Sequence, residues 1–328
     1  MSTPLETRLI RYDLALLCWA VLYPFLMPDF WVLNIGAPSL FFGLVALSLS
    51  FLAGYGGMVS LAQMTVAGVA GYALALTSVN AEAMGVPLPW PLAVAFAVLV
   101  AVLFSIFVGF LAARTEGIYL LMITLAIGMG FFFLVQQNDT VFNAFNGLQG
   151  VAVPQLFERP IRSEAQLFYF ICLGVAATFY AGIRYLVATP AGLALQAVRD
   201  DPRKAAALGY SVLAIKVAAF AAAGVPAALG GVLMVWYNQR ISPGSVDLGG
   251  ITAILIMAVV GGLRHPAGAF IGAVLYVLLQ NFAGTIVGAD RFNLLIGSIF
   301  LAVVLFSPDG LLGIARRLQA AMQRRRAA

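Results

Sequence analysis

Residues 90–113 read Trp90-Pro-Leu-Ala-Val-Ala-Phe-Ala-Val-Leu-Val-Ala-Val-Leu-Phe-Ser-Ile-Phe-Val-Gly-Phe-Leu-Ala-Ala113, and no charged side chain interrupts them. About 20 apolar residues are enough for a helix to cross the hydrocarbon core of a bilayer. Lipid offers the backbone no hydrogen-bond partners, so a continuous apolar run of this length predicts a membrane-spanning helix. A membrane β-barrel would instead show segments of about ten residues with alternating polarity.

The composition of the whole chain extends this prediction. Of the 328 residues, 62% are hydrophobic and 9% are charged, and the mean hydropathy is +1.00. Soluble domains carry about 25% charged residues, so this chain has too little polar surface for a water-soluble globule. We predict an all-α integral membrane protein with one transmembrane domain, residues 1–328, of about ten helices. The expected spans are 12–28, 37–54, 60–79, 90–112, 118–137, 167–187, 215–236, 251–263, 268–287 and 293–306.

The first span follows two arginines and resembles a secretory signal. No small-residue cleavage site follows it, so we expect a retained helix. With ten crossings both termini lie on one side, and the basic residues indicate which side. If the N-terminus is cytoplasmic, the outer segments hold only Arg159, Arg162, Arg240 and Arg291, and the other 14 of the 18 basic residues are inside. Basic residues favour the cytoplasmic side of membrane proteins, so both termini are predicted there.

Three polar segments lie outside the predicted spans. They are an outer loop at 138–166, an inner segment at 188–214 and a basic C-terminal tail at 314–328. The tail either contacts anionic lipid headgroups or is a plain solvated end after the last helix.

The inner segment contains the most informative run, Thr189-Pro-Ala-Gly-Leu-Ala-Leu-Gln-Ala-Val-Arg-Asp-Asp-Pro-Arg-Lys-Ala-Ala-Ala-Leu-Gly-Tyr210. Thr189 before a proline is a good helix start, because proline suits the first helical position. Asp201 is placed to cap a second short helix, and Gly209 is placed to end it. The run therefore predicts two short helices along the membrane surface, a shape suited to a groove of a soluble partner. Taken alone, it is equally compatible with an ordinary amphipathic loop.

This run resembles the coupling region of ABC importer permeases, specifically the branched-chain amino acid, LivM-like family. Other blocks agree in order along nearly the whole chain. They are Gly54–Gln63 with Gly71-Tyr72, Arg114–Tyr119 with Thr124-Leu125, Asn146-Gly147 with Gly150, Lys216 with Ala219-Phe220, Ile241–Pro243, and Val260–Gly268 with Gly272. Two departures are visible: Ser60-Leu-Ala-Gln63 stands where the family often has Ser-Leu-Gly-His, and Lys204-Ala-Ala replaces the Glu-Ala-Ala opening of the general importer motif.

The resemblance implies a transport subunit in a bacterial inner membrane that carries branched-chain or other amino acids. It implies four partners: two ABC ATPase subunits, a second homologous permease and an extracytoplasmic solute-binding protein. The residues expected to couple to the ATPases are Arg199, Asp200, Asp201, Arg203, Leu208 and Gly209. Urea or short amides are the alternative substrates, because their permeases look similar.

The energy source must lie on another chain. A phosphate-binding loop needs Gly-x4-Gly-Lys-Ser/Thr, and neither Lys204 nor Lys216 follows a glycine. Ion-coupled carriers usually keep charged groups inside the membrane, and none is central in a predicted span. We therefore predict no enzyme activity in this chain, no cofactor of its own, and ATP with magnesium on the partners. An ATP-independent channel or carrier is the rival hypothesis. The lone His265 and the separated Cys18 and Cys172 predict no metal site.

A pathway for a small zwitterion should be lined by hydroxyl, amide and backbone groups between closely packed helices. The predicted lining residues are Ser60, Gln63, Tyr119, Thr124, Asn146 and Gly147. Gln63 is the leading candidate, because an amide within a span needs a partner. The simpler interpretation is that the hydroxyl groups bond their own backbone and that Asn146-Gly147 belongs to a plain loop.

Overall fold

The computed structural model describes residues 18–78, 88–156, 159–160, 165–263 and 265–286, with isolated positions between 297 and 313. After a helical stretch at 18–26, the helices are α2 (Asp29–Trp31), the π-helical turn η1 (Val32–Gly36), α3 (Ala37–Gly56), α4 (Gln63–Leu76), α5 (Trp90–Ala112), α6 (Ile118–Gln137), α7 (Asp139–Phe142), α8 (Ala165–Ala188), α9 (Pro190–Asp200), α10 (Pro202–Ala207), α11 (Val212–Asn238), the 3-10 turn η3 (Pro243–Ser245), α12 (Leu248–Gly261) and α13 (Pro266–Ile286). The residues that the structure describes are helical apart from turns, loops and four two-residue strands.

Six of these helical segments are long and apolar enough to cross a membrane. They are Asp29–Gly56, Trp90–Ala112, Ile118–Gln137, Ala165–Ala188, Val212–Asn238 and Pro243–Gly261, and the shorter apolar helices are Gln63–Leu76 and Pro266–Phe282. The predicted count of about ten is therefore not confirmed. Most of the expected span at 293–306, the tail at 314–328 and the first six residues of the expected first span, 12–17, lie outside the described residues.

Helix α5 shows why these segments belong in lipid. Its buried positions are small residues at helical spacing, including Ala93, Ala97 and Ala101, whereas its exposed side chains are large and apolar, such as Phe96 and Leu103. A water-soluble helix would place its large apolar residues inward and polar ones outward. In a membrane the small residues let helices approach closely, and the large ones face lipid.

The centre of the bundle consists of α3, α4 and α11, which pack on one another. Gly230 and Gly231 of α11 allow the close approach. A Cβ on Gly230 would lie 2.9 Å from the carbonyl oxygen of Phe41 in α3, and a Cβ on Gly231 would overlap the backbone of Ala67 in α4. Helices α5 and α11 are also in contact, and Ser105 of α5 donates a 2.7 Å hydrogen bond to the carbonyl of Phe220.

Two expected spans differ from the structure. The helix predicted over 60–79 begins only at Gln63, because Gly57 takes a left-handed conformation (φ +65°) that ends α3. Residues 57–62 are not helical, although several of their side chains are buried. The span predicted over 251–263 begins earlier, at Leu248, where the side chain of Asp247 accepts a hydrogen bond from the backbone N–H of Gly250.

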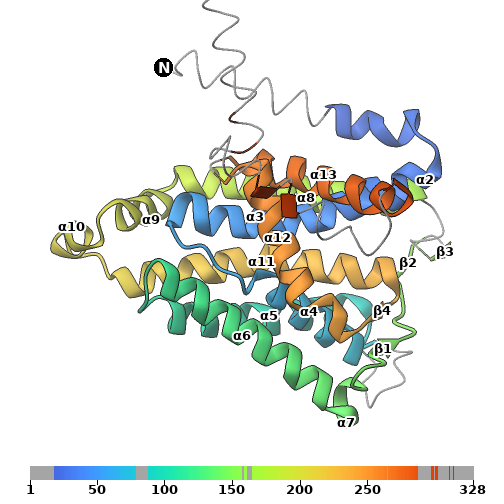
Figure 1. The fold of residues 1–328 in the computed structure, drawn as a ribbon, viewed down its shortest axis with the longest axis horizontal. Helices are drawn as coiled ribbons and strands as arrows, with labels where there is room; N and C mark the ends of the chain where they lie inside the picture. Colours follow the sequence, from blue (N-terminus) through green and yellow to red (C-terminus); the bar gives the residue numbers. More distant parts are fainter. Residues whose placement is uncertain are drawn as a thin grey trace, which may run out of the picture.

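Helices α9 and α10 lie at one end of the bundle, and the short strands with α7 lie at the opposite end (Figure 1). At the strand end β1 (Leu148–Gln149) pairs antiparallel with β4 (Arg240–Ile241). Strands β2 (Gln155–Leu156) and β3 (Arg159–Pro160) form a second small hairpin. The segments predicted to face opposite sides of the membrane thus lie at opposite ends of the bundle.

Candidate functional site

The predicted pair of short helices is present as α9 and α10. The Thr189 side chain accepts a hydrogen bond from the backbone N–H of Gly192, and Pro190 is the first residue of α9. The Asp201 carboxylate accepts bonds from the backbone N–H groups of Arg203 and Lys204, both at 3.1 Å. These hydrogen bonds, of which the one from Lys204 has the largest effect, hold the pKa of Asp201 below its usual value. Gly209 follows α10 with φ +89°.

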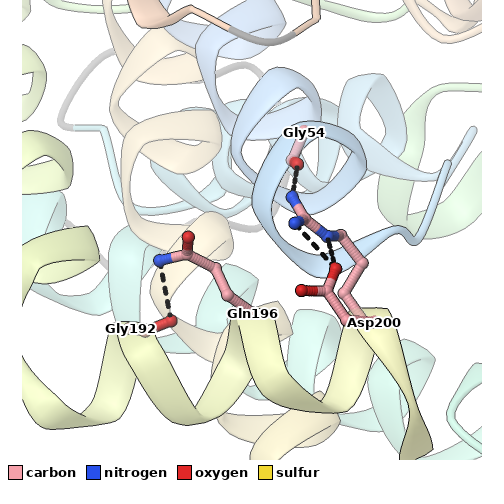
Figure 2. A network of polar contacts seen from close by, with 5 residues as sticks. Gly54, Gly192, Gln196 and Asp200 are labelled. Atoms are coloured by element: carbon pink, nitrogen blue, oxygen red, sulfur yellow. Dashed lines mark hydrogen bonds and ion pairs between the residues drawn. The ribbon is translucent and has the colours of Figure 1, made fainter.

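Arg199 forms a hydrogen bond between α9 and α3. Its guanidinium Nη1 donates a 2.8 Å hydrogen bond to the carbonyl of Gly54, in the last turn of α3 (Figure 2). The carbonyls of a last helical turn have no partner within the helix, and a cation there also interacts favourably with the helix dipole. Leu195 of α9 is buried beneath this contact, so the polar bond adds to an apolar interface.

The six predicted coupling residues therefore divide into two groups. Arg199 points into its own chain, and Asp200 forms an ion pair with it at 2.8 Å. Asp201 caps α10. Arg203, Leu208 and Gly209 are exposed at the end of the bundle, and Leu208 is 77% exposed. Asp200 is also accessible, with a side chain that is 67% exposed, and the coupling role of all six residues stays a prediction.

Three of the predicted pathway residues meet where α4 begins. The backbone N–H of Leu61 donates a 3.1 Å bond to Oγ1 of Thr124 in α6. The N–H of Ala62 donates to Oγ of Ser60 at 3.3 Å, and Oε1 of Gln63 accepts a 2.9 Å bond from Ser48 in α3. The four side chains in these bonds are all buried: Ser48, Ser60, Gln63 and Thr124. In the non-helical segment 57–62, the backbone N–H groups of Leu61 and Ala62 therefore donate to side-chain hydroxyl oxygens instead of to a helical ladder.

Two buried polar atoms near this point have no hydrogen-bond partner among the described residues. They are Nε2 of Gln63 and Oγ1 of Thr65. The Thr65 hydroxyl lies against α6, where a Cβ on Gly128 would come within 2.9 Å of it. An unpaired buried donor costs about 1–3 kcal/mol, and natural proteins keep few of them. Both atoms are fully buried, and a role for them in solute binding stays a prediction.

The other three predicted pathway residues lie elsewhere. Tyr119, at the first turn of α6, is 68% exposed. Asn146 is exposed in the turn before β1 at the strand end, and Gly147 beside it has φ +67°. A Cβ on Gly147 would overlap the carbonyl of Ile241 in β4, so the glycine there serves the pairing of the two strands. Tyr119 precedes Thr124 by five residues on α6 but is exposed, whereas Asn146 and Gly147 belong to the strand end, and the pathway role of all three stays a prediction.

The sequence matches the family described as the branched-chain amino acid transport system, permease component, over residues 32–305. The chain belongs to this permease family. Two relatives are high-affinity branched-chain amino acid transport system permease proteins LivM, from Salmonella typhimurium and Escherichia coli. Each is 25% identical to this chain over 92% of its length, covering 75% and 74% of the relative.

A third relative of this permease chain is the probable branched-chain amino acid transport permease protein LivH of Methanocaldococcus jannaschii, 31% identical over 39% of this chain and 42% of the relative. No solved structure matches the chain. The family match covers both α9–α10 and the start of α4. The chain is therefore a multi-pass transport subunit, as the resemblance implied.

Sequence reasoning on this permease missed two polar contacts that join distant segments. One is the Ser48 partner of Gln63. The other is an ion pair between Lys216 of α11 and Glu116 of the α5–α6 turn, at 3.3 Å. The Lys216 side chain is only 8% exposed. The position of Lys216 at the start of an apolar run could have indicated a charged group that needs a partner. The sequence does not identify that partner, because Glu116 is 100 residues away.

The permease also has an apolar cavity of about 310 Å³ between α3, α8 and α13. Its lining is almost entirely apolar, with Leu40, Leu173, Phe270 and Ile271 among the residues. Such a surface does not suit a zwitterion, so the cavity is a poor candidate for the solute site. Within the described ranges, no group of three or more His, Cys, Asp or Glu residues is placed to hold a metal ion.

Proposed function

We propose that this chain is the permease subunit of an ABC importer and forms part of the translocation pathway for branched-chain amino acids. The observation that carries the proposal is the family match over residues 32–305. The partners are two ATPase subunits, which bind ATP and magnesium, a second homologous permease and an extracytoplasmic solute-binding protein. The chain itself is not an enzyme and supplies no cofactor.

The distribution of charge supports a cytoplasmic location for the α9–α10 end. The basic residues of that end are Arg114, Arg184, Arg199, Arg203, Lys204 and Lys216, whereas the strand end has Arg240 and Arg159. Basic residues favour the cytoplasmic side. With the ten crossings that the sequence predicts, both termini would then lie in the cytoplasm.

The exposed surface of the helix pair supports docking to an ATPase. Leu193, Leu208 and Tyr210 are 58%, 77% and 48% exposed, respectively. They lie in or directly after α9–α10, which also carries Arg199, Arg203 and Lys204, and such a basic segment favours the cytoplasmic side over the lipid core. Among the described elements, helix α10 packs mainly on α9 and α11, and it projects from the bundle (Figure 1). A projecting short helix with apolar side chains fits a groove on a soluble partner.

The start of α4 supports a solute pathway. Helix α4 has only 14 residues, too few to cross a bilayer alone, and a buried non-helical segment precedes it. Broken helices with buried ends are the usual solute sites of transporters, because free backbone N–H groups there face anionic solute groups. Gln63 and Thr65 supply side-chain groups for the same purpose.

The Gln63→Leu substitution is expected to separate transport from stability. Leucine removes a buried donor that has no partner in the described structure, which is neutral or slightly stabilising for the fold. Ser48 keeps its 2.6 Å bond to the carbonyl of Val45. We therefore expect the Tm in detergent to stay within about 2 °C of wild type while uptake falls about tenfold or more.

The matched control is Thr77→Val at the other end of α4. The Thr77 hydroxyl is buried but bonds the carbonyls of Ala73 and Leu74 in its own helix. Uptake should therefore persist in this variant. Normal uptake by Gln63→Leu, measured with radiolabelled leucine, would remove Gln63 from the pathway.

Reconstitution distinguishes the importer from an ATP-independent channel or carrier. The chain alone in liposomes should give no leucine flux, whereas the chain with both ATPases, the second permease and the binding protein should give flux that requires ATP. Flux through the chain alone would contradict the proposal. Competition with valine, isoleucine, urea and acetamide then tests the substrate, and inhibition by urea alone would support the short-amide alternative.

A further inference from the structure

The first link between α9 and the pathway is the contact of Arg199 with α3. Besides the bond to Gly54, its side chain lies against Gly57, where an added Cβ would be 2.7 Å from Cγ of Arg199. Gly57 begins the non-helical segment 57–62. Any displacement of α9 along the membrane surface is therefore passed directly to the beginning of this segment.

The second link joins α11 to α6. Lys216 lies in the first turns of α11, which follows α10, and its Nζ is 3.3 Å from Oε1 of Glu116. Glu116 stands two residues before α6 begins at Ile118. The Lys216 side chain is 8% exposed, whereas that of Glu116 is 70% exposed, so loss of Glu116 would leave a largely buried ammonium group without its ion-pair partner. The start of α6 is therefore tied to the helix that leaves the α9–α10 unit.

The two links meet inside the bundle. Segment 57–62, reached through Arg199, and α6, reached through Lys216, are joined by the hydrogen bond from Leu61 N to Thr124 Oγ1. Gln63 follows two residues later. A packed core switches between discrete arrangements instead of deforming continuously, so both links acting together define the position of the entry to α4.

On the basis of the proposed function, we propose that Arg199 and Lys216 are positioning residues that transmit movement of α9–α10 to segment 57–62, and that Arg199 does not act by binding the ATPase. Movement of Arg199 displaces the end of α3 and Gly57, which it contacts. The ion pair of Lys216 with Glu116 fixes the position of the start of α6. The Leu61–Thr124 bond is the point at which the solute-facing groups are repositioned.

The test uses the complete complex in proteoliposomes, with Cys18→Ser and Cys172→Ala in the permease and Val59→Cys as a reporter. Val59 lies in segment 57–62 and is partly exposed. We expect trapping with ATP and vanadate to change the labelling rate of the reporter several-fold in this background. In Arg199→Met and Lys216→Met the reporter should be labelled at the same rate with and without trapping, and uptake should be lost. The ATPases should still copurify with both variants and hydrolyse ATP.

Two further variants keep the result specific. Arg199→Lys should restore part of the labelling change, since an ammonium group still donates to the Gly54 carbonyl, although without the fork geometry of arginine. Lys204→Met removes an 84% exposed cation whose ion pair is with Asp201, and it should keep the full change. Retention of the labelling change in Arg199→Met, or loss of the ATPases from it, would overturn the transmission role. An unmodified permease that fails to associate with the ATPases would instead overturn the proposed function itself.

Discussion

Replacement of Gly231 by leucine is expected to leave almost no folded protein. A Cβ at this position already overlaps the carbonyl group and Cα of Ala67 in α4, and these are backbone atoms that cannot rotate away. Overpacking a core by a few atoms costs about 1–3 kcal/mol, occasionally more, against a total stability of about 5–15 kcal/mol. A whole leucine side chain between α4 and α11 would separate two central helices.

Fluorescence-detected size-exclusion chromatography of detergent extracts measures this effect, and we expect the monodisperse peak to fall at least about tenfold. Gly174→Leu in α8 is the matched control, because Gly174 is exposed and has no atom within 4 Å of an added Cβ. Leucine is also a better helix former than glycine, so this control should fold normally. A normal peak for Gly231→Leu would show that α4 and α11 do not pack as described.

Substitution of Leu208 by glutamate is expected to release the ATPase subunits and abolish uptake. The side chain projects from the end of α10 with 77% exposure, so glutamate is tolerated in the isolated permease. In a docked complex its carboxylate would be desolvated in an apolar groove. Disruption of an interface hot spot costs about 2 kcal/mol or more, and each 1.4 kcal/mol is tenfold in affinity.

Copurification with tagged ATPase subunits measures this loss, and the thermal stability of the permease alone should not change. Phe145→Glu makes the same chemical change at a 74% exposed position, but at the strand end of the bundle, and should retain the ATPases. Full copurification with Leu208→Glu would show that the projecting end of the helix pair does not carry the interface.

Local sequence signals predicted much of this fold. The apolar run at 90–113 forms α5, whose bounds, 90–112, are those of the predicted span. The corner between α9 and α10 was predicted from Thr189, Asp201 and Gly209, and each takes the capping or turning role expected of it. Caps and apolar runs are readable because their physical causes lie within one or two helical turns of the residue concerned.

The break before α4 was only partly predictable. The expected spans 37–54 and 60–79 left a break between them, but the second helix was expected from residue 60 and begins at Gln63. The intervening residues are as apolar as a helix would be, and they stay non-helical because Thr124 supplies a distant acceptor for the N–H of Leu61. The bond of Arg199 to the end of α3 was likewise not predictable, because nothing near Arg199 in the sequence indicates that Gly54 lies beside it.

The sequence by itself determined that this chain lies in a membrane, which segments form its main helices, and that two capped helices lie between α8 and α11. Only the tertiary structure decided which polar groups from distant parts of the chain bond to one another. The deciding bonds join residues 63, 100 and 145 positions apart. Chain geometry imposes no pairing at such separations, so these contacts follow from the packing of the whole bundle.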